Sequence, residues 1–153
     1  MNKFSLLFLC VSAGFTPAAL NPAYALEPLL YTSKISPSSQ VLLREALPAP
    51  LESFDVAQTD LNDDGLYEFI VHPKDCASTP DTCSFDILAE TGDKMVSLGR
   101  IQARDIAIDS DKKFGVRSLR AFDNPRNDYS FSLYVWDAAR SRYMIEGQDH
   151  ARK

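Results

Sequence analysis

The sequence contains few histidines and none of the short motifs that mark the common catalytic sites. Its two histidines are His72 and His150, and the second lies in a polar C-terminal tail. Serine hydrolase (Gly-x-Ser-x-Gly), zinc protease (His-Glu-x-x-His) and phosphate-loop motifs are absent. His72 stands before Pro73, where a strand-end role is commoner than that of a base. The sequence therefore assigns no catalytic residue, and we expect a non-catalytic protein.

Two arrangements that would support catalysis or ligand binding stay open. Carboxylates from Asp105, Asp109 and Asp111 could pair as in glycosidases, although such abundant acids are usually solvated. Aromatic residues near the C-terminus could line a groove for a sugar or a peptide, although packing between strands is their commoner use. These aromatic residues are Tyr134, Trp136 and Tyr143.

A basic run is also missing from the sequence. Residues 1–25 hold one basic residue and no acid, so the remainder has 15 of the 16 basic residues against 21 acidic ones, a net charge of −6. Such a surface disfavours nucleic acid and anionic lipid. It suits cations or a basic partner, although an excess of this size is often only a solubility feature.

No apolar run is long enough to span a membrane. Residues 1–25 have a positive residue, Lys3, then an apolar run from Leu6 to Val11, and then Ala23-Tyr24-Ala25. The apolar run falls short of the roughly 20 residues that a span needs, and the small-x-small end is typical of a signal peptide. We expect cleavage after Ala25. The mature chain would then have no membrane span and would be periplasmic or secreted.

Cysteine is scarce, with three residues in the chain. Cys10 lies in the leader, where the preceding Leu9 differs from the small residue that a lipoprotein signal has. Cys76 and Cys83 remain as a pair, and in an oxidising compartment they predict a disulfide. Closing so short a loop stabilises the fold by about 2.5 kcal/mol. Two sulfurs and the nearby His72 fall short of the four ligands of a zinc site, and the spacing differs from the Cys-x-x-Cys of redox pairs.

One short helix is expected near the start of the mature chain, after an arm without clear periodicity over residues 26–36. Ser36 is a suitable N-cap and Pro37 suits the first helical position. Apolar residues follow up to Ala46, and Pro48-Ala49-Pro50 then ends the run. The sequence predicts a helix over residues 37–46 that packs against a sheet, or else serves as a partner-binding arm.

After Pro50 the sequence alternates between apolar and polar residues in short runs with turn signals between them, as in antiparallel β structure. We expect a mainly β (α+β) fold: one antiparallel sheet, β-sandwich or barrel of about 7–8 strands, in a single domain over residues 26–153. Charged turns are expected at 109–113 and 123–128, and the strand at 129–136 is expected to be central. The predicted strands are 54–59, 66–72, 84–90, 95–102, 105–108, 116–122, 129–136 and 142–146.

One segment between the first two predicted strands has the composition of a calcium loop. Oxygen-bearing side chains stand at every second position, at Asp60, Asn62 and Asp64, and Gly65 permits a sharp turn before Glu68. Asn, Asp and Gly also form turns that bind nothing. However, closely spaced acids repel one another unless a cation lies between them, which favours calcium.

The loop resembles the Asp-x-Asp/Asn-x-Asp-Gly-x-x-Asp/Glu loops of FG-GAP or integrin α-type repeats. The resemblance implies one calcium ion held by the side chains of Asp60, Asn62, Asp64 and Glu68 and by the Leu66 carbonyl. An EF-hand would need an acid at loop position 12, where this sequence has a valine. Because the loop occurs once, a propeller of such repeats is not implied.

The mature chain is also similar to small bacterial periplasmic proteins, mostly uncharacterised. The shared features are such a loop before a strand, a cysteine pair, and an aromatic motif like Tyr134-Val135-Trp136-Asp137 followed by Tyr143. This likeness implies a location more than a biological task.

Two functions are compatible with these features. The first is a non-catalytic periplasmic domain with one structural calcium, whose exposed face binds a protein or an envelope component. The second is a periplasmic inhibitor or immunity protein against a cell-wall hydrolase such as a lysozyme or amidase. The inhibitor would insert an acidic turn, 109–113 or 123–128, into a basic cleft.

Overall fold

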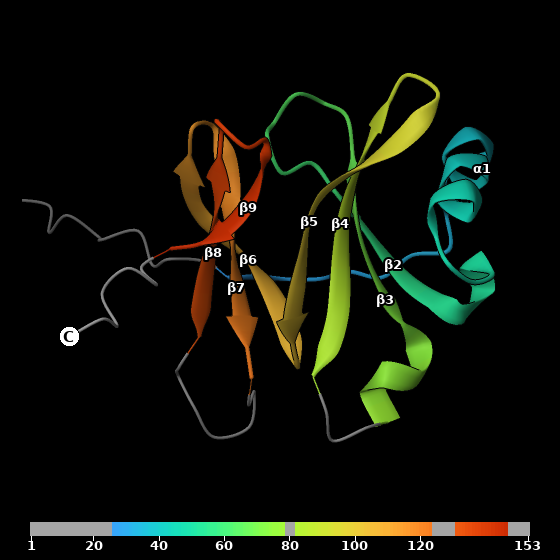
Figure 1. The fold of residues 1–153 in the computed structure, drawn as a ribbon, viewed down its shortest axis with the longest axis horizontal. Helices are drawn as coiled ribbons and strands as arrows, with labels where there is room; N and C mark the ends of the chain where they lie inside the picture. Colours follow the sequence, from blue (N-terminus) through green and yellow to red (C-terminus); the bar gives the residue numbers. More distant parts are fainter. Residues whose placement is uncertain (1–25, 79–81, 124–130, 147–153) are drawn as a thin grey trace, which may run out of the picture.

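Two antiparallel sheets and one helix make up the protein in a computed structural model that describes residues 26–78, 82–123 and 131–146 (Figure 1). The mainly β prediction is confirmed. The predicted leader, most of the 123–128 turn and the tail with His150 lie outside the described residues. The first sheet has the order β1 (Glu27–Pro28), β6 (Asp105–Lys113), β7 (Val116–Phe122), β8 (Ser132–Asp137) and β9 (Arg142–Ile145). The second has the order β2 (Phe54–Thr59), β3 (Glu68–Pro73), β4 (Cys83–Thr91) and β5 (Lys94–Ala103).

The helix α1 (Pro37–Ala46) has the predicted bounds. The Ser36 side chain accepts a hydrogen bond from the Ser39 backbone N–H at 3.1 Å, which satisfies one of the free donors at the helix start. Leu43 is fully buried on the face that packs against the four-stranded sheet. In the described part of the chain, no helix is long and apolar enough to cross a membrane.

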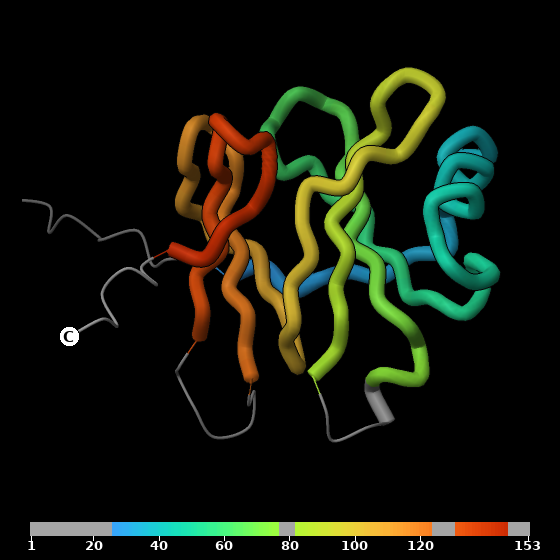
Figure 2. Tube along the Cα trace, viewed as in Figure 1, coloured from blue at the N-terminus to red at the C-terminus, as the bar shows by residue number. Residues whose placement is uncertain are grey.

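Two apolar clusters hold these layers together. The larger contains side chains from both sheets, among them Ile70, Phe85, Ile101, Leu119 and Tyr143. The smaller combines residues of α1 with residues of the four-stranded sheet. Figure 2 shows that the helix lies on the side of this sheet away from the other sheet. The four-stranded sheet is therefore covered on both faces, by the other sheet and by the helix.

The charged segment 109–113 is part of a strand, so the prediction of a turn there is wrong. These residues continue β6 and pair with β7 beyond a bulge, at Lys112–Arg117 and Lys113–Val116. The reversal comes later, at Phe114 and Gly115, which both have positive φ. Asp109 is only 2% exposed and its carboxylate accepts a hydrogen bond from Arg120 Nε at 2.5 Å. The charged composition of 109–113 is therefore no sign of a turn, because Asp109 has a partner on the neighbouring strand.

The remaining strand predictions need small corrections. β8 begins at Ser132, later than predicted, and lies between β7 and β9 as an interior strand. The predicted arm forms the short strand β1 and then a bridge from Tyr31 to Ala57 on the edge of β2. Because this pairing uses backbone groups, it requires no periodic pattern of side chains, and the sequence therefore does not indicate it.

Cys76 and Cys83 form the predicted disulfide, with their Cα atoms 5.5 Å apart. It joins the 3₁₀ helix Lys74–Ser78 after β3 to the first residue of β4. The Cys83 side chain is buried in the larger core cluster. The bond therefore fixes the connection between two neighbouring strands at the edge of the core.

Candidate metal site

The segment 60–67 closes the hairpin between β2 and β3, whose last pair is Thr59 and Glu68. Asp63 and Gly65 have φ values of +57° and +83°, so the chain turns sharply twice within the loop. The loop lies at the same end of the molecule as the β4–β5 and β6–β7 turns (Figure 2). The predicted ligand residues thus lie on a tight connection between paired strands.

Side-chain oxygens of the loop turn inward, toward its own backbone. The Asp60 carboxylate accepts hydrogen bonds from the backbone N–H groups of Asp64, at 3.2 Å, and Gly65, at 2.9 Å. The Asn62 amide oxygen also accepts from Asp64 N–H, at 3.0 Å, and Asp64 accepts from Leu66 N–H at 2.7 Å. The structure therefore gathers the three side chains at alternate positions around one turn of backbone.

Glu68 enters this site from the buried side. Its side chain is 5% exposed, and Oε2 accepts the Leu61 backbone N–H at 2.7 Å. Burial raises the pKa of Glu68, the hydrogen bond from Leu61 lowers it, and the charges of Asp64 and Asp60 raise it further. Asp60 and Asp64 are thus close enough to Glu68 to disfavour its charge.

Asp63 behaves differently from its neighbours in the loop. Its exposed carboxylate pairs with Lys112, and Arg117 Nη2 lies 3.7 Å from Asp63 Oδ1. The hydrogen bond from Lys112 lowers the pKa of Asp63. Among the described residues, the carboxylates of Asp60, Asp64 and Glu68 form no ion pair with a basic side chain. The acids at the predicted ligand positions are those without a neutralising partner.

The donor set suits calcium, which prefers carboxylate, amide and carbonyl oxygens over nitrogen or sulfur. A carboxylate oxygen has more than one lone pair, so it can accept an N–H and still contact a cation. Within 26–78, 82–123 and 131–146, no three His, Cys, Asp or Glu side chains are grouped to hold a metal ion. A calcium site here would therefore depend on the Asn62 amide oxygen and the Leu66 carbonyl as well as on the acids.

Leu61 anchors the loop, and sequence reasoning missed it. Its side chain is fully buried in the larger core cluster. Its N–H donates to Glu68, and its carbonyl accepts from the Arg117 N–H of β7 at 2.7 Å. The sequence does contain a signal for this role, since Leu61 is an apolar residue within a run of acidic and amide residues. The loop is thereby fixed to both sheets.

The structure places valine, not an acid, at the twelfth loop position. Val71 lies in β3, is 1% exposed and pairs with Val56. No carboxylate can reach a loop ion from there, which agrees with the rejection of an EF-hand.

Three other residues considered from the sequence, Trp136, Tyr143 and His72, pack against neighbouring rings. Trp136 and Tyr143 contact edge to face at 5.7 Å, and the Tyr143 hydroxyl donates to the Arg117 carbonyl at 2.8 Å. Burial raises the pKa of Tyr143. His72 is 6% exposed, with rings of Tyr31 and Phe85 at 5.1 and 4.8 Å.

The chain was compared with protein-family models, with curated proteins and with solved structures, and none of the three comparisons gave a match.

Proposed function

We propose that this protein is a non-catalytic, periplasmic or secreted domain that binds one structural calcium ion through its 60–68 loop. Its exposed face would bind a protein or an envelope component. The observation that carries the calcium proposal is the contrast between Asp63, which has Lys112 and Arg117 beside it, and the trio of Asp60, Asp64 and Glu68, which form no ion pair with a described basic side chain and of which the first two raise the pKa of the third. A cation held by the loop, with the Asn62 amide oxygen and the Leu66 carbonyl among its ligands, would supply the missing positive charge.

The ion's role would be to hold the two sheets together at one end. Leu61 joins the loop to β7 and to the core, so ordering the loop also orders the contact between the sheets. Calcium at about 100 times its dissociation constant would add about 2.7 kcal/mol to the free energy of unfolding. This is comparable to the contribution of the disulfide.

The disulfide between Cys76 and Cys83 is compatible with an oxidising compartment. Together with the leader-like composition of residues 1–25, it supports export of the protein.

Exposed apolar side chains beside the loop support a binding role. Leu66 and Tyr67, which follow the turn, are 65% and 53% exposed, and Phe114 on the β6–β7 turn is 72% exposed. The ion pair between Asp63 and Lys112 holds these two turns near each other. Apolar side chains grouped at one end of a domain are a common feature of interaction sites.

The inhibitor alternative loses one of its two candidate segments, because 109–113 is a strand whose Asp109 is buried against Arg120. No observation on the described residues favours that function over the first.

Thermal unfolding in calcium and in chelator tests the proposal. The wild type should melt at a higher temperature with calcium, and Asp64→Ala should melt at the same temperature in both. Equal melting temperatures for the wild type with calcium and with chelator would refute the calcium site. An envelope extract passed over the immobilised protein should then yield a partner whose retention falls in the Tyr67→Ser variant, and retention unchanged by that variant would refute the binding face.

A further inference from the structure

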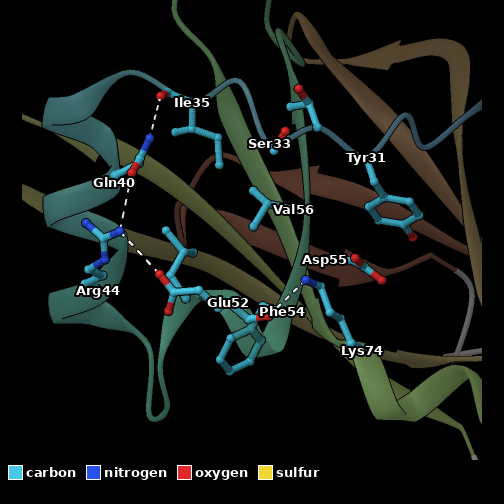
Figure 3. Close-up of a pocket in the computed structure, with 12 residues that line it drawn as sticks. Tyr31, Ser33, Ile35, Gln40, Arg44, Glu52, Phe54, Asp55, Val56 and Lys74 are labelled. Carbon is cyan, nitrogen blue, oxygen red and sulfur yellow. Dashed lines mark hydrogen bonds and ion pairs between the residues drawn. The ribbon is translucent and has the colours of Figure 1, made fainter.

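Figure 3 shows a cavity at the edge of β2, between α1, the N-terminal arm and the 3₁₀ helix Leu51–Ser53. Both of its basic side chains already contact Glu52. Arg44 pairs with the Glu52 carboxylate at 3.4 Å, and Lys74 Nζ donates to the Glu52 backbone carbonyl at 2.9 Å. Because these two groups already have partners in the protein, a second cavity is better suited to a ligand.

The second cavity, of about 440 Å³, lies between the first turn of α1, the 60–67 loop and the β4–β5 turn. Its size falls in the range of small-molecule sites. Serines at the start of the helix form one side of it, and residues 65–67 of the loop form another. Segments that are far apart in the sequence thus enclose one space.

Three strands supply the floor, on the face of the four-stranded sheet that α1 covers. Gln58 of β2 follows Val56 by two residues and pairs with Phe69 of β3, and both Val56 and Phe69 belong to the smaller core cluster. Glu90 of β4 follows Leu88, another member of that cluster, by two residues. Side chains alternate between the two faces along a strand, so Gln58, Phe69 and Glu90 share the face that lines the cavity.

The helix side of the cavity carries a row of hydroxyl groups that ends on a carboxylate. Ser39, which is 7% exposed, donates to Glu90 Oε2 at 2.7 Å. The Ser39 hydroxyl oxygen also lies 2.8 Å from that of Ser36, which in turn lies 2.9 Å from that of Ser38. Among the described residues, Glu90 Oε1 has no hydrogen-bond donor. The protein therefore holds this carboxylate in place and leaves one of its oxygens for a ligand.

The sheet and the loop add an amide group and an aromatic ring. The side chains of Gln58 and Tyr67 form no hydrogen bond with the residues that the structure describes, and neither has a polar atom that is fully buried. Tyr67 is 53% exposed, and Leu66 beside it is 65% exposed. The cavity thus combines hydrogen-bonding groups that lack partners with an aromatic ring open to solvent.

The charge of the cavity narrows the class of ligand. Among the described residues that line it, only Glu90 is charged, so an anionic ligand would be repelled. A carboxylate only accepts hydrogen bonds, whereas the Gln58 amide and the serine hydroxyls both donate and accept. A simple cation would satisfy Glu90 but would offer no acceptor to Gln58. The hydroxyl groups of a sugar satisfy both kinds of group, and the C–H groups on one face of its ring can pack on an aromatic side chain.

We propose that this cavity binds an uncharged sugar unit of a glycan chain. Hydroxyl groups of the sugar contact Glu90, Ser38 and Gln58, and one face of its ring lies on Tyr67. The glycan is then the envelope component of the proposed function, so this inference rests on that function and names the chemical class of its ligand.

An array of immobilised oligosaccharides, probed with the purified protein in calcium, tests the assignment. The uncharged probes are cellotetraose, maltotetraose, mannotetraose and N-acetylated chitotetraose, and the acidic probe is tetragalacturonic acid. We expect binding to at least one uncharged probe and none to the acidic one. Calorimetric titration with the bound sugar should give the same affinity at low and high salt, because no ligand charge is neutralised on binding.

Two variants connect the sugar to this cavity. Glu90→Gln keeps an acceptor for Ser39 but removes the charged acceptor for the sugar, and it should weaken binding roughly tenfold. Tyr67→Ser removes the ring and should weaken binding by a similar factor of about 10. The matched controls are Glu45→Gln on the exposed side of α1 and Phe114→Ser on the β6–β7 turn, both outside the cavity. Both controls should bind like the wild type, and melting temperatures confirm that each variant is folded.

No binding to any uncharged probe at millimolar concentration would overturn the proposal. Tighter binding to the acidic probe would do so too, as would losses in the two controls that match those in Glu90→Gln and Tyr67→Ser. A calcium-dependent rise in melting temperature without glycan binding would refute the glycan assignment alone. Glycan binding without that rise would support the assignment and refute only the calcium site.

Discussion

The buried carboxylate of Glu68 accepts the backbone N–H of Leu61 at 2.7 Å, across the base of the loop that joins β2 to β3. Leu61 in turn receives a hydrogen bond from β7 through its carbonyl. A charged group near the core thus fixes the residue that connects the loop to both sheets. The same carboxylate is close to Asp60 and Asp64, whose charges raise its pKa.

Glu68→Gln should separate the structural role of Glu68 from its role toward calcium. Glutamine keeps an oxygen that can accept the Leu61 N–H, but it removes the buried charge and its repulsion with Asp60 and Asp64. In chelator, we expect the variant to melt at or above the wild-type temperature at neutral pH. In calcium, it should lose most of the wild-type increase. A large loss of stability in chelator would show that the hydrogen-bond geometry, and not charge, dominates this position.

Removing the disulfide should lower the free energy of unfolding by about 2.5 kcal/mol. The double variant Cys76→Ala, Cys83→Ala should show this loss in urea titrations. The wild type in reductant provides the matched comparison, because it loses the same bond without any change of sequence. A reduced wild type as stable as the oxidised protein would contradict the prediction.

Arg120→Met should destabilise the fold by about 3 kcal/mol, because it leaves the Asp109 carboxylate buried without its partner. Part of that loss comes from the contact of the guanidinium with the Phe131 ring, whose centroid is 4.3 Å away. The double variant Asp109→Asn, Arg120→Met should recover part of the stability in urea titrations. A double variant that is as unstable as the sum of the two single variants would show that the two side chains do not interact.

The fold should weaken in alkali as Tyr31 ionises. The folded-state pKa of Tyr31 is raised to about 12 from 10.0, so its contribution to stability is fully present below pH 10 and is lost as the pH rises toward 12. Tyr31→Phe should remove one ionisation step near pH 12 from the tyrosinate absorbance titration. It should also flatten the fall in stability between pH 10 and 12. A titration curve identical to that of the wild type would contradict this assignment.

Local signals in the sequence were sufficient for several elements. The Ser36 cap, Pro37 and the prolines after Ala46 determine α1, and alternating apolar residues determine β2 and β7. The disulfide could also be predicted from the sequence, because its two cysteines are close in the chain.

Features that depend on distant residues could not be read in this way. The 109–113 segment became a strand because it pairs with β7, and Asp109 is compensated by Arg120 on that strand. Composition identified the candidate loop, but the contrast between Asp63 and its neighbours depends on Lys112 and Arg117, far along the chain. The cavity between α1 and the 60–67 loop combines residues from the helix, the loop and three strands, so no single stretch of sequence indicates it.

The calcium loop is the central claim, and calorimetric titration with calcium tests it most directly in three proteins: the wild type, Asp64→Asn and Asp63→Asn. The two variants remove one charge each from adjacent positions, but only Asp64 lacks a basic partner. We predict one calcium ion per chain for the wild type, binding close to that of the wild type for Asp63→Asn, and strongly weakened binding for Asp64→Asn. No heat of binding in the wild type, or an equal loss in both variants, would contradict the account.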